Sequence, residues 1–540
     1  MQFNVKKKTD VIDDHRSQRN AFIAEQPTEV VHIPDPSIDI FKGNTARATS
    51  PEKDTHPKKN EQKKKKQEKK NDTGYVITSY LFLFLFALIQ GIIIYAQKTG
   101  PFYDEAIYAT AGLRTLDGKG VTDGYLVWFA GSLLWPVLSG IGYTLHGLLG
   151  IRAIAAILTC FTVLFSYLTA KNLFGVRAAF FSVVLFVFSG PLLALAHLGV
   201  YDVPALTFTS ISLWAMTRFK SDHRLWLSIS AISLAIATIA KYPIALMMLP
   251  ILGILITFRK QKSVTDICLF LFIFIAVFLA FFLSFQYQVG SWLLWSSRNK
   301  PTFGSSEATI IAAQLYLGLL PLSIALLGFF VAPRKKEALI LLLAGLIWPA
   351  YHILSRNPVS DNKHVIFGFL FLYPLMGLFC AYLWQKKWFG KPLATVLCML
   401  LAIVGAAGLY ILDFAWPDVR QPATYLSTHS QMGDQFLIDN AWPYTMYLYA
   451  DNKTKDPWAV YDNYRINNKE NSENICDYTW YVDEKGSYSW SDALRKQIKA
   501  CHTFIPVYHT SSSAIQLGPD LQYKRYTITT TIYKNLHANR

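Results

Sequence analysis

Long apolar runs recur through this chain from residue 75 to residue 412, and they dictate the kind of protein it can form. A hydrocarbon core about 30 Å thick requires roughly 20 apolar residues per helix. Hydrophobic residues make up 52% of the chain and charged residues only 16%, which is unusual for a soluble protein. We therefore predict a mainly α-helical, polytopic membrane protein with about 11 transmembrane helices. The expected spans are 75–96, 150–170, 177–196, 203–218, 225–240, 243–258, 266–286, 309–331, 338–354, 365–384 and 392–412.

A polar tail, residues 1–74, precedes the first run. It contains few aromatic residues and includes the cluster Lys63–Lys66, a composition that buries too little apolar area to fold. Because the first run is a full span long and lies far from the N-terminus, we expect a retained anchor rather than a cleaved signal peptide. We predict a disordered basic cytoplasmic tail whose lysines contact membrane lipids or set the topology. No aromatic residues alternate with the lysines, which argues against nucleic-acid binding.

Short basic segments between the runs provide a check on topology, because cytoplasmic loops carry an excess of Lys and Arg. If the tail lies inside, the basic segments between the runs also lie inside. The loop 97–149 and the region 413–540 then lie outside. We expect a multi-pass protein of the cell membrane with a cytoplasmic N-terminus. The net charge of +16 is then explained largely by topology and lipid contact. The basic loops that agree are 171–177, 218–224, 259–262, 334–336 and 386–391.

Two adjacent carboxylates, Asp104 and Glu105, lie in the loop 97–149 just after the first run. Charged groups beside a membrane span are costly to keep there without a partner or a use. We predict a helix over 104–116, in which Asp104 and Tyr108 share one face, and interfacial helices in the aromatic remainder of the loop. The carboxylates are candidate catalytic residues, and Tyr108 is a candidate for substrate binding. The alternative is an acid pair that only stabilises the helix N-terminus.

Two further charged residues lie at predicted outer turns. Asp202 is followed by Val203 and Pro204 at the start of the fourth run, and Lys241 lies between the fifth and sixth runs. Asp202 is a candidate catalytic residue, whereas Lys241 and the adjacent Tyr242 are candidates for substrate binding. The alternatives are an N-cap role for Asp202 and a Lys241 that only reaches the lipid headgroups.

The outer loop before the tenth run contributes Arg356, Lys363 and His364 as further substrate-binding candidates. The alternatives are solvation or headgroup binding for Arg356 and Lys363, and structural hydrogen bonding for His364. Carboxylates facing cations at one membrane surface suit an anionic, lipid-borne substrate and a proton-accepting step.

No cofactor follows from the motifs. Neither a GxGxxG nor a GxxxxGKS sequence occurs, which argues against nucleotide-sugar or ATP chemistry. The carboxylates and His364 are of the ligand types that a divalent metal takes, but no ligand spacing demands one, so metal binding stays open.

The region 413–540 is polar and rich in Tyr, Asn, Asp and Thr, and we predict a small extracytoplasmic α/β domain there, with a strand at 523–533. It serves either packing or acceptor recognition. Cys476 and Cys501 are its only cysteines, and in an oxidising compartment they predict one disulfide, with free or lipid-shielded thiols as the alternative.

Several short segments, taken in order, resemble the core of the GT-C membrane glycosyltransferases. The resemblance is to the branch that contains the protein O-mannosyltransferases and the aminoarabinose transferases of lipid A, which are dolichyl-phosphate-mannose mannosyltransferase-like. It covers about residues 75–380. The segments are Phe102-Tyr103-Asp104-Glu105 with Tyr108, Trp135-Pro136-Val137-Leu138, Arg152, Leu173-Phe174-Gly175, Tyr201-Asp202-Val203-Pro204 and Lys241-Tyr242-Pro243.

The resemblance implies a transmembrane catalytic domain at 75–412 that moves a hexosyl or pentosyl group from a polyprenyl-phosphate donor to an outer-face acceptor, with inversion. The acceptor would be a glycan, lipid or protein of the cell envelope. It also implies that Asp104 accepts the acceptor's proton, while Lys241 and the cations at 356–364 balance the leaving phosphate. Asp202 and Glu105 would orient groups around them.

Two departures limit the comparison. The aminoarabinose transferases carry a Lys-Pro-Pro element in the first outer loop, whereas the stretch 122–128 here contains no lysine. The protein O-mannosyltransferases insert a β-trefoil domain, and its absence argues against a protein acceptor.

A transporter or flippase of lipid-linked or envelope substrates is the rival interpretation. Transporters place charged groups near the bilayer midplane and often contain internal repeats. Here the charges gather at one surface and no repeat is evident, which favours the enzyme. A non-catalytic sugar-binding component on the same fold is a third interpretation.

Overall fold

The computed structural model describes most of the chain beyond residue 56. The described residues are 57–97, 99–119, 129–219, 224–258, 263–298, 307–355, 361–386, 388–438, 440–455, 460–461, 475–485, 492–517 and 523–537. The expected disordered tail therefore lies mostly outside the described residues.

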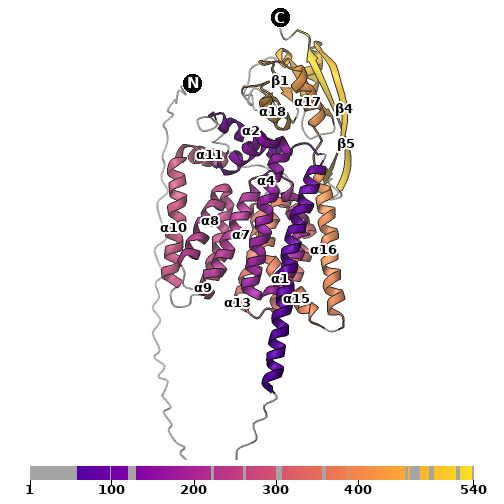
Figure 1. Cartoon of the computed structure of the whole chain (residues 1–540). Helices are drawn as coiled ribbons and strands as arrows, with labels where there is room; N and C mark the ends of the chain where they lie inside the picture. Colours follow the sequence, from indigo (N-terminus) through magenta and orange to yellow (C-terminus); the bar gives the residue numbers. More distant parts are fainter. Residues whose placement is uncertain are drawn as a thin grey trace, which may run out of the picture. The chain divides into compact units, whose positions relative to one another are not determined.

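Helices make up the described chain as far as residue 413 (Figure 1). They are α1 (Pro57–Ala96), α2 (Tyr103–Leu116), α4 (Leu134–Phe174), α5 (Val176–Val187), α6 (Gly190–Ala196), α7 (Asp202–Arg218), α8 (Arg224–Ala240), the 3₁₀ helix η2 (Tyr242–Met247), α9 (Met248–Phe258), α10 (Ser263–Ser284), α11 (Gln286–Arg298), α12 (Glu307–Val331), α13 (Lys335–Gly345), α14 (Ile347–Ser355), α15 (Asp361–Trp384) and α16 (Gly390–Asp413).

Six helical segments in the described residues are long and apolar enough to cross a membrane, and a bent pair would make seven. They are Asp72–Ala96, Leu134–Phe174, Ser263–Ser284, Lys335–Leu354, Lys363–Trp384 and Gly390–Ile411, with the pair Val176–Val187 and Gly190–Ala196 bent by 67°. The expected eleven spans are therefore not confirmed. Several apolar runs form helices shorter than a bilayer requires, such as α7 and α8 with 17 residues each.

The expected helix at 104–116 is present as α2. Its first turn contains Asp104 and Glu105, which favour the helix N-terminus through the helix dipole. Glu105 Oε2 also accepts the backbone N–H of Phe102 at 2.8 Å, so the carboxylate satisfies a donor just before the helix. The helix ends before Gly118, whose φ of +74° no other residue type adopts easily.

Helix α4 extends further toward the N-terminus than the expected span at 150–170. It begins at Leu134 and is broken at His146 and Gly147, where Gly147 takes φ +58° and ψ −144°. The part before the break packs directly against α2, because a Cβ on Gly112 would lie 1.9 Å from Pro136 O. The aromatic part of the loop 97–149 is thus partly helical, while 120–128 lies outside the described residues.

Helix α15 lies at the centre of the helical core. Of the residues in its candidate span, 83% are buried, far more than in any other candidate span of the described chain. It packs against α12, α5, α13 and α4. Its first turn is therefore held rigidly, which matters because two predicted site residues lie there.

A five-stranded sheet dominates the residues after 413 (Figure 1). Its strand order is β2-β1-β3-β5-β4, with β1 parallel to β2 and β3, and β5 antiparallel to both neighbours. The expected strand at 523–533 falls within β5. The elements are α17 (Arg420–His429), β1 (Phe436–Ile438), α18 (Ala441–Ala450), β2 (Val460–Tyr461), η4 (Ile475–Asp477), β3 (Trp480–Lys485), α20 (Asp492–Ala500), β4 (Phe504–Leu517) and β5 (Tyr523–Asn535).

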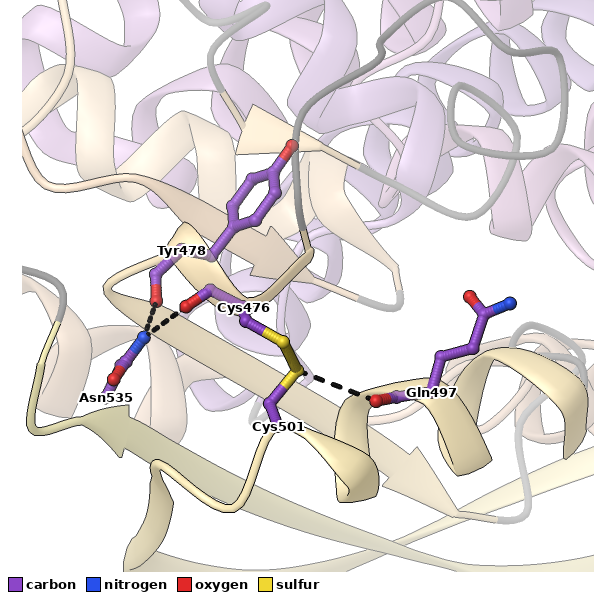
Figure 2. The surroundings of a disulfide bond; sticks show 5 residues. All are labelled: Cys476, Tyr478, Gln497, Cys501 and Asn535. Carbon is purple, nitrogen blue, oxygen red and sulfur yellow. Dashed lines mark hydrogen bonds between the residues drawn. A yellow bond between two sulfur atoms is a disulfide. The ribbon is translucent and has the colours of Figure 1, made fainter.

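The disulfide expected from the two cysteines of this region is present and joins Cys476 in η4 to Cys501 after α20 (Figure 2). Asn535 at the end of β5 donates to the carbonyl oxygens of Cys476 at 2.7 Å and Tyr478 at 3.0 Å. The covalent bond and the amide together tie the two segments to the sheet.

Candidate functional site

Five predicted site residues lie where helices begin or break. Asp104 is in the first turn of α2, Asp202 is the first residue of α7, and Lys363 and His364 are in the first turn of α15. Lys241 lies between α8 and η2, where a following proline prevents a continuous α-helix and leaves the backbone extended at φ −154° and ψ 99°. The bonds described below bring these side chains together at one end of the bundle.

The first contact joins the residues farthest apart in sequence. Lys363 Nζ donates to Asp104 Oδ2 at 2.6 Å. The lysine side chain is 6% exposed and the aspartate side chain is 29% exposed. The ammonium group also lies 4.9 Å from the centre of the Phe102 ring, within cation–π range. Asp104 is thus paired yet still reachable from outside.

The second contact is deeper. Lys241 Nζ donates to Asp202 Oδ1 and also contacts Nε2 of His364. His364 Nε2 lies 3.6 Å from the same aspartate oxygen. Asp202 is only 1% exposed. This carboxylate is thus enclosed by its partners.

A histidine that the sequence did not single out extends this cluster. His352 Nε2 lies 2.9 Å from Nδ1 of His364, and both rings are buried. Trp348 packs against the His364 ring with centroids 5.0 Å apart. A polar residue inside the apolar run 338–354 was the available signal, because ionisable residues within spans usually have a function.

One tyrosine ring lies against the lysine of the deeper pair, and two more tyrosines lie nearby in the structure or the sequence. Tyr108 and Tyr201 meet edge to face with centroids 5.2 Å apart, and Lys241 Nζ lies 4.7 Å from the Tyr201 centroid. Tyr242 OH donates to the carbonyl oxygen of Ala130 at 2.7 Å. Tyr108 therefore lies beside the charged cluster, whereas the Tyr242 hydroxyl holds the segment before α4.

Glu105 follows Asp104 in the sequence, but its carboxylate bonds to residues outside the charged cluster. Its oxygens accept from Arg152 at 2.9 and 3.1 Å and from the backbone N–H of Gly199 at 2.7 Å, besides Phe102. Arg152 also donates to the carbonyl oxygens of Thr99 and Gly100. A fully buried carboxylate with this many donors holds three chain segments in place.

The last predicted site residue, Arg356, lies outside the described residues. Within the described part of the chain, no group of three or more His, Cys, Asp or Glu side chains is arranged to hold a metal ion. The assembled site therefore consists of two carboxylate–lysine pairs, two histidines and neighbouring aromatic rings. Such a site can bind an anion through its lysines and can accept a proton at its more exposed carboxylate.

A model of the family described as dolichyl-phosphate-mannose-protein mannosyltransferase matches residues 135–286. The structure of ArnT from Cupriavidus metallidurans bound to undecaprenyl phosphate is similar, with a TM-score of 0.52 and 14% identity over 85% of this chain and 98% of that one. Its apo structure gives a TM-score of 0.53 with the same identity and coverage. At this identity the likeness shows that the chain has the same fold as this ArnT.

A weaker likeness links this chain to the oligosaccharyltransferase AglB from Archaeoglobus fulgidus, solved with an inhibitory peptide and a dolichol-phosphate. The TM-score is 0.48 and the identity 10%, over 83% of this chain and 74% of that one. No curated protein sequence matches. The family-model match contains Asp202 and Lys241 but neither Asp104 nor Lys363, so the site extends beyond the matched segment.

Proposed function

We propose that this protein is an integral-membrane, inverting glycosyltransferase of the GT-C type that moves a sugar from a polyprenyl-phosphate donor to an acceptor hydroxyl. The observation that carries the proposal is the pair of neighbouring carboxylate–lysine contacts, Asp104 with Lys363 and Asp202 with Lys241. The undecaprenyl phosphate bound to ArnT, which has the same fold, supports a lipid phosphate as the ligand.

The exposure of the two carboxylates separates their roles. Asp104 keeps 29% of its side chain exposed and can accept from an acceptor hydroxyl, whereas Asp202, at 1%, is enclosed by Lys241 and His364. We assign Asp104 as the general base. Asp202 then holds Lys241, because a buried ammonium requires a partner.

The two lysines are assigned to the donor phosphate. As the acceptor oxygen bonds to the anomeric carbon, the bond from that carbon to the phosphate oxygen breaks and its electron pair remains on the phosphate. Asp104 takes the hydroxyl proton. The growing charge on the leaving phosphate is balanced by Lys363 and Lys241 without protonation. Arg356 stays a predicted third cation for this charge.

The contact between Asp104 and Lys363 gives donor binding a second role. While Lys363 bonds to Asp104 Oδ2, that oxygen is occupied as a proton acceptor. A phosphate that draws Lys363 toward itself would free the carboxylate for the acceptor. We therefore propose that the donor binds before the base becomes available.

The remaining predicted residues have supporting roles in this proposal. Glu105 positions Asp104 by fixing the start of α2 through Arg152. Tyr108 lines the site beside Tyr201, and Tyr242 contacts substrate through its ring. The basic loops of the sequence support a cytoplasmic N-terminus and an extracytoplasmic region 413–540. The acceptor would then be a cell-envelope glycan or lipid.

The test compares Asp104→Asn with the parent protein in detergent, using a panel of polyprenyl-phosphate sugars and measuring released polyprenyl phosphate. We expect kcat to fall about 100- to 10,000-fold, the usual contribution of a general base. Asp477→Asn is the control, because it makes the same change at an exposed carboxylate of the sheet region. Transfer by Asp104→Asn at the parent rate would contradict the assigned role.

The same assay separates the enzyme from a transporter, since no compartments exist in detergent. Release of polyprenyl phosphate by the parent supports the transferase. Absence of release with every donor, together with movement of a lipid-linked sugar across the bilayer of proteoliposomes, would favour the flippase.

A further inference from the structure

A chain of hydrogen bonds leads from the deeper ion pair to a residue that the proposed chemistry does not use. Lys241 bonds Asp202 and Nε2 of His364, and Nδ1 of His364 lies 2.9 Å from Nε2 of His352. All four side chains are buried. The chain thus connects α7, the break before η2, α15 and α14.

The donors and acceptors along this chain assign the protons. A lysine ammonium has donors only, so Nε2 of His364 must accept from Lys241. The proton of a neutral His364 is then on Nδ1, which must donate. Nε2 of His352 is therefore the acceptor of that proton.

The loss of this acceptor would affect Lys241. Without His352, the buried Nδ1–H of His364 would have lost its partner, which costs free energy. His364 could avoid that cost by moving its proton to Nε2. The N–H would then face the Lys241 ammonium, and two donors would oppose each other.

Packing restricts the ways in which the rings can adjust. Trp348 lies with its ring centroid 5.0 Å from that of His364 and 6.3 Å from that of His352. The His364 and His352 centroids are themselves 5.0 Å apart. In such a close-packed environment the rings cannot easily rotate to exchange their nitrogens.

We propose that His352 is a positioning residue whose Nε2 fixes the His364 tautomer and so holds the Lys241 ammonium with one N–H left for the donor phosphate. The inference rests on the proposed function, in which Lys241 meets that phosphate. Two of the three ammonium protons are used by Asp202 and His364. The third is not used by these two partners, and the Tyr201 ring centroid lies 4.7 Å from the ammonium nitrogen.

The experiment compares His352→Gln with His352→Phe in the full-length protein. A glutamine keeps an oxygen acceptor near the Nε2 position, whereas phenylalanine keeps the ring shape without an acceptor. With undecaprenyl phosphate as the probe, we expect His352→Phe to weaken binding about 10- to 100-fold, as when a residue that orients a metal-binding histidine is removed. His352→Gln should stay close to the parent.

A transfer assay with the donor found in the panel adds a second readout. His352→Phe should lower kcat and leave the acceptor KM unchanged, and His352→Gln should restore most of the rate. Because His352→Phe could unfold the protein, ¹⁵N NMR of the parent provides a test without a variant. We expect His364 to carry its proton on Nδ1, and a proton on Nε2 would overturn the inference.

The outcomes separate this inference from the proposed function. A parent that binds no undecaprenyl phosphate and transfers no sugar contradicts the proposed function and this role together. A parent that binds and transfers, alongside a folded His352→Phe that does both equally well, overturns the positioning role alone.

Discussion

Asp104 and Asp202 carry the same functional group but differ in what surrounds it. The sequence allowed Asp202 to be an N-cap, yet Tyr201 is the N-cap of α7 and no side chain caps that helix. Lys241 could have reached the headgroups, yet it is buried and bonded to Asp202. At this scale, the partner that a charged group finds determines what it can do.

A buried carboxylate in the sheet region gives a pH-dependent prediction at the same scale. Burial raises the pKa of Glu484 from 4.5 to about 7, although Tyr444 OH donates to it at 2.8 Å. The folded state then holds a proton that the unfolded state releases above pH 4.5. This stabilisation is complete below pH 4.5 and is lost as the pH rises through 7, which amounts to about 3 kcal/mol.

Glu484→Gln should therefore flatten the dependence of thermal stability on pH between 4.5 and 7, because the amide does not ionise. The measurement is thermal unfolding of the full-length protein across that range. Asp477→Asn, an exposed carboxylate in the same region, is the control and should leave the slope unchanged. A steep slope that survives in Glu484→Gln would argue against a buried, protonated Glu484.

Helices α2 and α4 touch through their backbones, and this contact places the first turn of α2. Gly112 and Gly140 face each other so closely that a Cβ on Gly140 would lie 2.6 Å from the Gly112 carbonyl carbon. The contact has no room for a side chain. The position of Asp104 thus depends on two glycines far from the charged cluster.

Gly112→Ala should push α2 away from α4, because its Cβ would overlap Pro136 O. We expect a loss of about 1–3 kcal/mol in the free energy of unfolding, typical of overpacking. Gly91→Ala in α1 is the control, since nothing lies within 4 Å of its Cβ and alanine favours a helix. Denaturant unfolding in detergent measures both, and equal stability of the two variants would contradict the contact.

The residues after 413 touch the same segment that carries the site. Trp416 Nε1 donates to Gly100 O at 3.4 Å, and its ring lies 4.7 Å from that of Phe102. At the other end of α2, Tyr449 OH donates to Asp117 Oδ2 at 2.7 Å. At the scale of the whole molecule, the sheet region clamps both ends of α2, which favours a role in holding the site together.

Trp416→Ala should loosen the start of α2 by removing the contacts to Gly100 and Phe102. We expect faster hydrogen exchange in residues 99–110 and a lower transfer rate. Arg525→Ala is the control, because Arg525 donates to Tyr410 OH in α16 instead. Unchanged exchange in Trp416→Ala, or an equal increase in the control, would mean that this clamp does not order α2.

The helical membrane architecture, the α2 helix and the disulfide were predictable because each depends on local composition or on few alternatives. Apolar length and periodicity are properties of neighbouring residues, and only two cysteines lie in the polar C-terminal region. The count of eleven spans is not confirmed, because bends such as the 67° between α5 and α6 divide an apolar run without changing its composition.

The residue types of the site were also visible in the sequence, since charges beside apolar runs are rare. Their pairing was not. Lys363 meets Asp104 across 259 residues, and His352 joins the cluster from inside an apolar run. Hydrophobicity is a property of a short stretch of chain. An ion pair instead requires the charged atoms of two side chains, here from distant helix ends, to lie within about 3 Å of each other. Packing alone therefore made Glu105 a structural anchor and its neighbour Asp104 the accessible carboxylate.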